Sequence, residues 1–219
     1  MTRRLIALAR VFVGGFRGGL AYFNLLANMF MAAIIGSATA QIAVMSRAMV
    51  PAMEEEGYDK GFATATTAAG GLLAPVIPPS MMFVIFGVLA QVPIGEMFVA
   101  GIIPGLILAT AFALVITLIG WWQQFPKGVW MSRAEAIRAL IAALPAMLVP
   151  LAIIGGILFG IATPTESAAI ASLIAFLVGW LVYRDLKPAA LGAMFIRTAA
   201  NASMILFMIA AASVFGSGA

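Results

Sequence analysis

Long apolar runs follow one another along this chain, and several approach the roughly 20 residues that an α-helix needs to cross a bilayer. In lipid, only helices and closed barrels satisfy every backbone polar group, and these runs are continuous rather than alternating, which favours helices. Of the 219 residues, 64% are hydrophobic and 9% are charged, whereas a soluble domain carries about 25% charged residues. The sequence therefore predicts an all-α polytopic membrane protein.

The basic residues stand singly at the ends of the apolar runs. This placement is typical of the cytoplasmic flanks of membrane helices, so the net charge of +4 indicates a lipid bilayer, and no nucleic acid, as partner. The sequence contains no Cys and no His, which excludes thiolate chemistry and removes the commonest proton shuttle and metal ligand. A serine nucleophile would have no evident base, so we do not expect an enzyme.

The first two segments set the topology. Residues 1–17 mix arginines with apolar residues and are predicted as an interfacial, arm-like helix, whereas 18–53 is too long for one simple span and too short for two spans with a loop. The small and polar residues Gly36–Ala40 stand in the middle of that segment. Two interpretations are open: a re-entrant hairpin that turns at membrane depth, or one long tilted helix. The positive flanks favour the hairpin, which returns Glu54–Lys60 to the cytoplasm.

The segment 61–90 is apolar but is divided by the run Ala74–Ser80, which holds three prolines. Prolines remove backbone donors and cannot continue a helix, so the sequence predicts a broken transmembrane helix here. The elements expected after it are a transmembrane helix over 98–122, a cytoplasmic connector over 123–139, two transmembrane helices within 140–183 joined at 160–166, and a transmembrane helix over 197–216 at a truncated end.

At the joint 160–166, Thr163 can act as N-cap, Pro164 occupies the favoured first position and Glu166 falls at the third. This spacing predicts a capping box with proline at its first helical position. A carboxylate at membrane depth can also serve in a transport path. Glu166 therefore has two open interpretations, with the cap favoured.

The two predicted breaks, at Gly36–Ala40 and Pro75–Ser80, share one chemistry. A helix that ends at membrane depth presents unpaired carbonyls, and a helix that begins there presents unpaired N–H groups. Carbonyl and hydroxyl oxygens suit a hard cation such as Na⁺, and N–H groups suit a carboxylate. Paired breaks of this kind form the ion and substrate sites of many secondary transporters, although each break alone could be a packing kink.

A set of short motifs gives a more specific indication through its order and spacing. The motifs are Gly18-Gly19-Leu20, Gly36-Ser37, Pro51-Ala52-Met53, Gly57-Tyr58, Ile77-Pro78-Pro79-Ser80, Gly101-Ile102-Ile103-Pro104-Gly105 and Gly160-Ile161-Ala162-Thr163-Pro164-Thr165-Glu166. In these motifs the chain resembles the large permease (M, DctM-like) subunit of the tripartite, binding-protein-dependent TRAP transporters. The similarity covers essentially this whole chain but only the middle of the family's chain, so we expect a fragment without the family's leading helices and second hairpin.

The resemblance implies part of an elevator-type transporter fold, in a multi-pass protein of the bacterial inner membrane. It implies a sodium-coupled importer of organic acids such as C4-dicarboxylates, with Na⁺ as coupling ion and no other cofactor. The implied partners are a small DctQ-like membrane subunit, a DctP-like periplasmic solute-binding protein and the organic acid. The family usually has a further Ser beside the Gly-Ser pair, where this chain has Ile35 and Ala38, so fewer hydroxyl ligands are expected.

Together, the breaks and the resemblance give two sets of candidate site residues. The candidate sodium ligands are Gly36, Ser37, Thr39, Ala74, Val76 and Pro78. The candidate substrate-binding residues are Ser37, Ala38, Thr39, Pro79, Ser80, Thr163 and Thr165. Two other functions stay open: a divalent-anion:sodium symporter that needs no binding protein, against which the motifs argue, and a truncated fragment that transports nothing.

Overall fold

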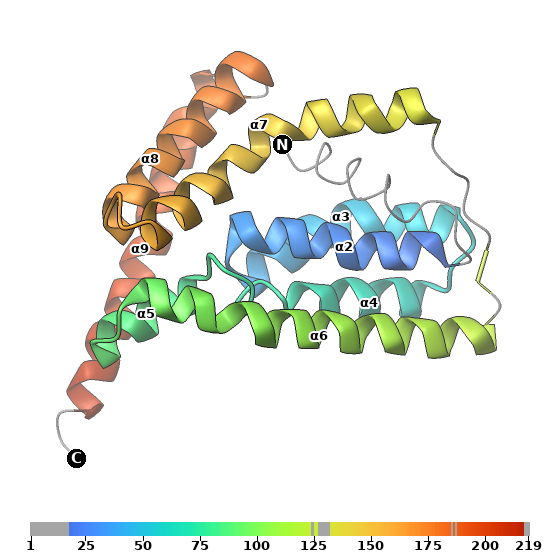
Figure 1. The fold of residues 1–219 in the computed structure, drawn as a ribbon, viewed down its shortest axis with the longest axis horizontal. Helices are drawn as coiled ribbons and strands as arrows, with labels where there is room; N and C mark the ends of the chain where they lie inside the picture. Colours follow the sequence, from blue (N-terminus) through green and yellow to red (C-terminus); the bar gives the residue numbers. More distant parts are fainter. Residues whose placement is uncertain (1–17, 124, 127–131, 185, 187, 217–219) are drawn as a thin grey trace. The chain divides into compact units, whose positions relative to one another are not determined.

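The fold is known from a computed structural model (Figure 1). The structure describes residues 18–123, 125–126, 132–184, 186 and 188–216, and the predicted interfacial helix over 1–17 lies outside them. The described residues form helices and no strand, which agrees with the predicted all-α class. The chain forms two compact units, one up to Ala175 and one from Phe176 onward.

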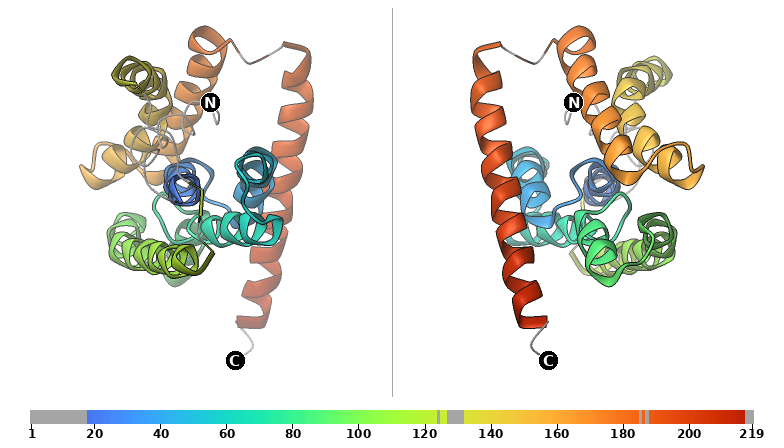
Figure 2. Two further views of the ribbon diagram at one scale, coloured as in Figure 1. Left: turned by 90° about the vertical axis from the view of Figure 1, so that its right-hand side faces the viewer. Right: turned by 90° about the vertical axis from the view of Figure 1, so that its left-hand side faces the viewer.

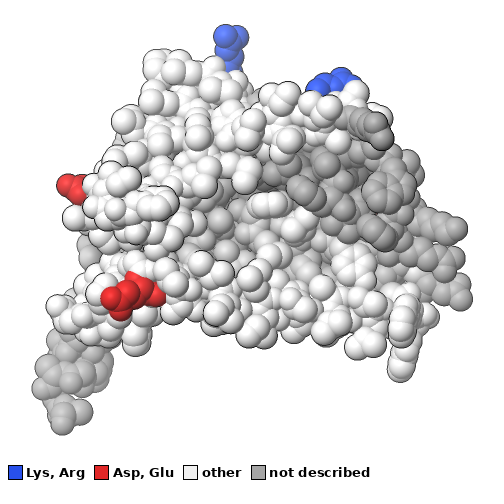
Figure 3. Space-filling view, in the orientation of Figure 1, with Lys and Arg blue, Asp and Glu red and all other residues white. Residues whose placement is uncertain are grey.

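Four helices in the described part of the chain are long and apolar enough to cross a membrane: Ile94–Gln123, Ala134–Leu158, Pro164–Val182 and Leu191–Ala211. They agree with a polytopic membrane protein. In Figure 3, charged side chains are few on the face that is shown, and most of the surface there is uncharged. Such a surface would be unusual in water and is expected in lipid.

The segment after Gly18 forms two helices, α2 (Gly19–Ile35) and α3 (Ala38–Glu55), rather than one long helix. Helix α2 ends because Gly36 adopts φ +62°, a left-handed conformation that glycine takes at little cost. Ser37 is extended, and the chain then turns back into α3. Figure 2 views the pair nearly end-on, with α2 and α3 side by side.

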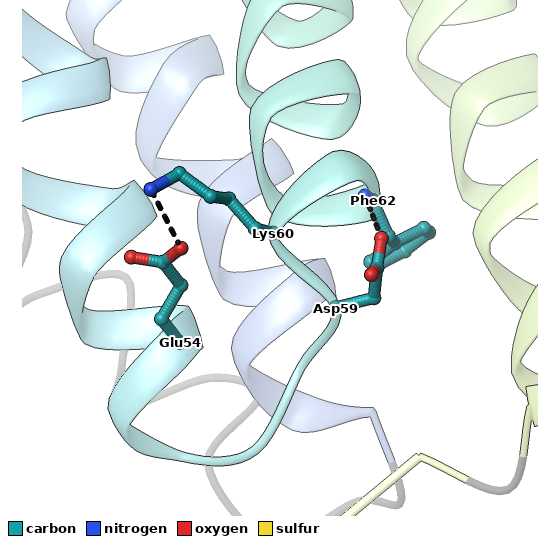
Figure 4. A network of polar contacts seen from close by, with 4 residues as sticks. All are labelled: Glu54, Asp59, Lys60 and Phe62. Atoms are coloured by element: carbon teal, nitrogen blue, oxygen red, sulfur yellow. Dashed lines mark hydrogen bonds and ion pairs between the residues drawn. The ribbon is translucent and has the colours of Figure 1, made fainter.

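The segment predicted as a broken helix forms α4 (Lys60–Gly71) and α5 (Met81–Ala90), with Leu72–Ser80 between them. Helix α4 begins at a side-chain cap, because the Asp59 carboxylate accepts a hydrogen bond of 2.9 Å from the Phe62 backbone N–H (Figure 4). Beside it, Lys60 pairs with Glu54 at 3.4 Å across the turn from α3 (Figure 4). This pair is exposed, and exposed pairs contribute only about 0–1 kcal/mol.

Helix α6 (Ile94–Gln123) runs antiparallel to the broken helix and packs against both of its halves (Figure 1). It begins four residues before the span that the sequence predicted. Gly101 and Gly105 let it approach the break closely: a Cβ at Gly101 would lie 2.8 Å from the Val76 carbonyl oxygen, and one at Gly105 would lie 3.0 Å from Ile77. The glycines of this motif thus serve packing.

Helices α7 (Arg133–Leu158) and α8 (Pro164–Leu177) follow. Helix α7 begins at a capping box in which Ser132 and Glu135 bond each other's backbone N–H groups. Residues 133–139, expected in the connector, are therefore its first two turns. The charged residues there suggested a loop, but the capping pattern starts a helix.

In the second unit, α8 continues into a π-helical turn at Val178–Val182, and α9 (Pro188–Gly216) follows. Phe176 and Trp180 pack against each other in this unit, with ring centres 5.9 Å apart. Helix α9 begins nine residues before the predicted span at 197. Proline at the first helical position explains this start, because its missing N–H would be unpaired there in any case.

Candidate functional site

The two predicted breaks lie against each other. The Gly36 carbonyl accepts a hydrogen bond of 3.3 Å from the Met81 backbone N–H. A Cβ at Gly36 would lie 3.1 Å from the Pro79 carbonyl oxygen and 3.3 Å from the Met81 nitrogen. The tip of the α2–α3 hairpin is thus held at the point where the break ends and α5 begins.

At the tip, the start of α3 offers polar groups. Ser37 is the N-cap residue but makes no capping hydrogen bond, so its side chain leaves the first-turn N–H groups of α3 unoccupied. The Ser37 and Thr39 hydroxyl oxygens lie 3.3 Å apart. Ser37 and Ala38 are half-buried and Thr39 is exposed. These groups can accept a cation through the hydroxyls and an anion through the N–H groups.

In the break, Ser80 is fully buried, and its hydroxyl donates a hydrogen bond of 2.7 Å to the Pro75 carbonyl. Ala74 and Pro78 are buried as well. The candidate ligand Val76 differs from the others, because its carbonyl lies against Gly101 of α6. Pro79, a candidate substrate-binding residue, has its carbonyl oxygen against the Gly36 position at the tip.

Thr163 and Thr165 lie elsewhere, at the start of α8. The predicted capping box is confirmed: Glu166 Oε2 accepts a hydrogen bond of 2.8 Å from the Thr163 N–H, and the Glu166 N–H lies 3.3 Å from Thr163 Oγ1. Thr165 is exposed. The flanking residues Ala162 and Pro164 line a cavity of about 1040 Å³ with the α5–α6 turn. Among the described residues, no hydrogen bond joins Thr163 or Thr165 to the hairpin tip.

Sequence reasoning missed a cluster of buried amides beneath the tip. The side chains of Asn24 and Asn28 on α2, Gln41 on α3 and Thr67 on α4 are fully buried and hydrogen-bonded in series. We call this set the amide relay. Its signal was present, since two asparagines four residues apart lie on one helix face, and such residues in an uncharged segment are costly unless they are paired.

At the other end of the hairpin, Tyr58, Phe62 and Phe125 form an aromatic cluster, with ring centres 4.7–6.1 Å apart. The Gly18 N–H donates a hydrogen bond of 3.1 Å to the Pro126 carbonyl beside it. Burial raises the pKa of Tyr58 to about 12. The start of α2, the α3–α4 turn and the end of α6 are therefore fixed together at one end.

The fold and the paired breaks define a polytopic membrane protein whose helices are interrupted at a shared point. The model of one family, the DctM component of the tripartite ATP-independent periplasmic transporters, matches residues 1–218. The chain belongs to this family, as the motifs indicated. It is therefore a transporter permease component and not an enzyme.

The curated relatives that the chain matches are TRAP transporter permease proteins, in agreement with the family model. The chain is 35% identical to the 2,3-diketo-L-gulonate TRAP transporter large permease protein YiaN of Escherichia coli, over 98% of this chain and 50% of that protein. It is 33% identical to the C4-dicarboxylate TRAP transporter large permease protein DctM of Pseudomonas aeruginosa, over 98% of this chain and 50% of that protein. It is 36% identical to the isethionate TRAP transporter permease protein DctMQ of Oleidesulfovibrio alaskensis, over 99% of this chain and 34% of that protein. The chain thus spans at most about half the length of these relatives.

Proposed function

We propose that the chain belongs to the membrane permease of a sodium-coupled, binding-protein-dependent importer of organic acids such as C4-dicarboxylates. The observation that carries this proposal is the contact between the hairpin tip at Gly36 and the break at Pro79–Met81 in a member of the TRAP permease family. The relatives are named for C4-dicarboxylate, 2,3-diketo-L-gulonate and isethionate. These solutes are organic anions, which suits a site that contains helix N-termini.

We further propose that the hairpin is re-entrant. Its arms have 17 and 18 residues, and α6 has 30, which correspond to about 26 Å, 27 Å and 45 Å at 1.5 Å per residue. The tip contacts the break at Pro79–Met81, inside the segment 60–90, while α6 continues past this contact beside α5. Both ends of the hairpin lie at the Tyr58 and Phe125 end, which the positive flanks assign to the cytoplasm.

The sodium ligands would be oxygens at the tip and the break. Ser37 and Thr39 supply hydroxyls, and the carbonyls of Gly36, Ala74 and Pro78 are the backbone candidates. Val76 is the weakest of the proposed set, because its carbonyl lies against Gly101. The organic acid would lie at the start of α3, near Ser37, Ala38 and Thr39, with Pro79 and Ser80 across from it. The geometry favours these residues over Thr163 and Thr165.

In this proposal the hairpin and helices α4–α6 are the part of an elevator-type transporter that carries solute across the inner membrane. The aromatic cluster and the contact at Met81 support it, because they fix these elements to one another at both ends of the hairpin. A small DctQ-like membrane subunit and a DctP-like periplasmic binding protein would complete the assembly. One relative is named DctMQ, which is consistent with a joined membrane subunit.

The test is uptake by the complete transporter that contains this chain, reconstituted in liposomes with its binding protein and a labelled C4-dicarboxylate. We expect saturable uptake with an inward Na⁺ gradient, and loss of uptake when choline replaces Na⁺ or when the binding protein is left out. Equal uptake in choline would contradict sodium coupling. Full uptake without the binding protein would instead support the independent symporter.

A further inference from the structure

We propose that Gln41 is a positioning residue for the sodium site: its side-chain amide joins both arms of the hairpin to α4 directly beneath the tip. The inference rests on the proposed sodium coupling. It is carried by the amide relay, which links α2, α3 and α4 at the level of the two breaks. None of its four side chains lies among the candidate ligands.

The contacts of Gln41 place it between the two breaks. Its Nε2 lies 2.9 Å from the Asn28 carbonyl, 2.9 Å from Asn28 Oδ1 and 3.3 Å from the Gly70 carbonyl. Its own backbone N–H donates to the Ser37 carbonyl at 3.0 Å, so it stands one helical turn beyond the tip. Gly70 stands in the last turn of α4, just before the break. The amide therefore connects the turn below the tip with the turn before the break.

The relay continues in one direction away from Gln41. Asn28 Nδ2 donates to Asn24 Oδ1 at 2.9 Å, Asn24 Nδ2 donates to Thr67 Oγ1 at 2.8 Å, and the Thr67 hydroxyl donates to the Ala63 carbonyl at 2.7 Å. Each donor polarises the next amide in such a series, which strengthens the bonds of a buried network. The relay thus resists a change in the spacing of the three helices more than separate contacts would.

The packing beside the relay is tight at two glycines of α4. A Cβ at Gly70 would lie 2.7 Å from the Asn28 amide, and one at Gly71 would overlap Ile42. The last turn of α4 therefore touches both hairpin arms through glycines. The hydrogen bond from Met81 to Gly36 and the hydrogen bond from the Gln41 amide to Gly70 thus attach the hairpin to both sides of the break.

Gln41 Oε1 is fully buried and has no hydrogen-bond donor among the described residues. An unpaired buried oxygen costs about 1–3 kcal/mol. The hydrogen bonds of the Gln41 side chain are all made by its nitrogen, which faces three carbonyl oxygens. An apolar side chain of similar size would lose all three contacts and release the tip from α4.

The experiment compares Gln41→Met, Gln41→Glu and the control Met45→Leu in the complete transporter. Met45 is fully buried one turn further along α3 and lies outside the relay. We expect Gln41→Met to raise the Na⁺ concentration for half-maximal uptake at least tenfold, with maximal uptake within about twofold of wild type. Gln41→Glu should raise the Na⁺ concentration for half-maximal uptake at least as much, because it replaces the N–H donor with an oxygen atom. Met45→Leu should leave the half-maximal Na⁺ concentration unchanged.

A second readout does not depend on transport. Spin labels on cysteines at Ala40 and Met82, both exposed, would report the distance between tip and break. We expect a narrow, Na⁺-sharpened distance distribution in wild type and a broad one in Gln41→Met, but not in Met45→Leu. The proposal would be overturned if Gln41→Met left both the distance distribution and the Na⁺ dependence of uptake unchanged. It would also be overturned if Gln41→Glu bound Na⁺ more tightly than wild type, because the side-chain oxygen would then be a ligand. Sodium-independent uptake by wild type would refute the proposed function, and the spin labels would still decide the role of Gln41.

Discussion

The carbonyl oxygen of Gly36 lies 3.3 Å from the amide nitrogen of Met81, so the residue that turns the hairpin also receives a hydrogen bond from the first residue of α5. Two interruptions whose contacting residues, Gly36 and Met81, stand far apart in sequence thus become one structural point. At this point the end of α2 and the start of α5, which carry opposite partial charges, are joined.

Gly36→Ala should abolish uptake, because Gly36 combines φ +62° with a Cβ position 3.1 Å from the Pro79 carbonyl oxygen. The measurement is the rate of solute uptake by the complete transporter that carries Gly36→Ala. Gly57→Ala is the matched control, since Gly57 has φ +90° with no atom within 4 Å of its Cβ position. That variant should lose about 1–2 kcal/mol of stability through backbone strain and keep its transport. Equal loss in both variants would show that strain alone, and not contact at the tip, matters.

Ser37→Ala should weaken sodium dependence, because one of the two hydroxyls at the tip disappears. We expect the Na⁺ concentration for half-maximal uptake to rise severalfold at unchanged protein level. Ser46→Ala, on the same helix with its hydroxyl bonded to the Ala43 carbonyl, should have no effect. An unaltered Na⁺ titration curve for Ser37→Ala would remove its hydroxyl from the proposed ligands.

The proposed re-entrant topology predicts opposite sides of the membrane for Lys60 and Gln91. Lys60 is exposed at the end that holds the aromatic cluster, whereas Gln91 is exposed beyond α5. Because the described sequence has no cysteine, single cysteines can be introduced at both positions. An impermeant thiol reagent added to intact cells should label position 91 and not position 60. Labelling of position 60 from outside would contradict the re-entrant hairpin.

The capping box predicts that Glu166 is structural. Glu166→Gln keeps an oxygen acceptor for the Thr163 N–H and should reduce uptake less than twofold. Thr163→Ala removes the cap hydroxyl and should lower thermal stability by about 1 kcal/mol. Thermal unfolding and uptake together separate the two interpretations: a complete loss of uptake in a stable Glu166→Gln protein would identify the carboxylate as a proton carrier.

The aromatic cluster predicts sensitivity to alkali. Burial raises the pKa of Tyr58 to about 12, above the ordinary value of about 10 for an unfolded chain. Its contribution to stability is therefore complete below about pH 10 and is lost as the pH rises through 12. The thermal unfolding temperature of wild type should fall steeply between about pH 10 and pH 12. In Tyr58→Phe the decline should be shallower, and an identical decline would exclude ionisation of Tyr58 as its cause.

The features that could be predicted from sequence are those that depend on local chemistry. Glycine at the hairpin turn, the prolines of the break and the Thr163–Glu166 spacing each act through their own backbone, so the residues are sufficient. The start of α7 had the same kind of signal in Ser132 and Glu135, but the nearby arginines suggested a loop. The sequence did not indicate which carbonyls face the tip, because that depends on how closely Gly101 of α6 approaches Val76.

The amide relay illustrates the limit of reasoning from the sequence alone. Asn24 and Asn28 can be paired by their spacing on one helix, but their partners Gln41 and Thr67 come from other helices. A polar side chain in an apolar run signals that a partner exists and does not say which one. That choice is made by the contact of three helices, which only the folded chain shows.

The hydrogen bond from Gly18 to the Pro126 carbonyl closes residues 18–126 into a loop whose entrance and exit adjoin. The two ends of this segment therefore leave at one end of the hairpin, beside the aromatic cluster of Tyr58, Phe62 and Phe125. Exchange of the Gly18 and Tyr58 amide hydrogens should for this reason report the opening of that end as a single event.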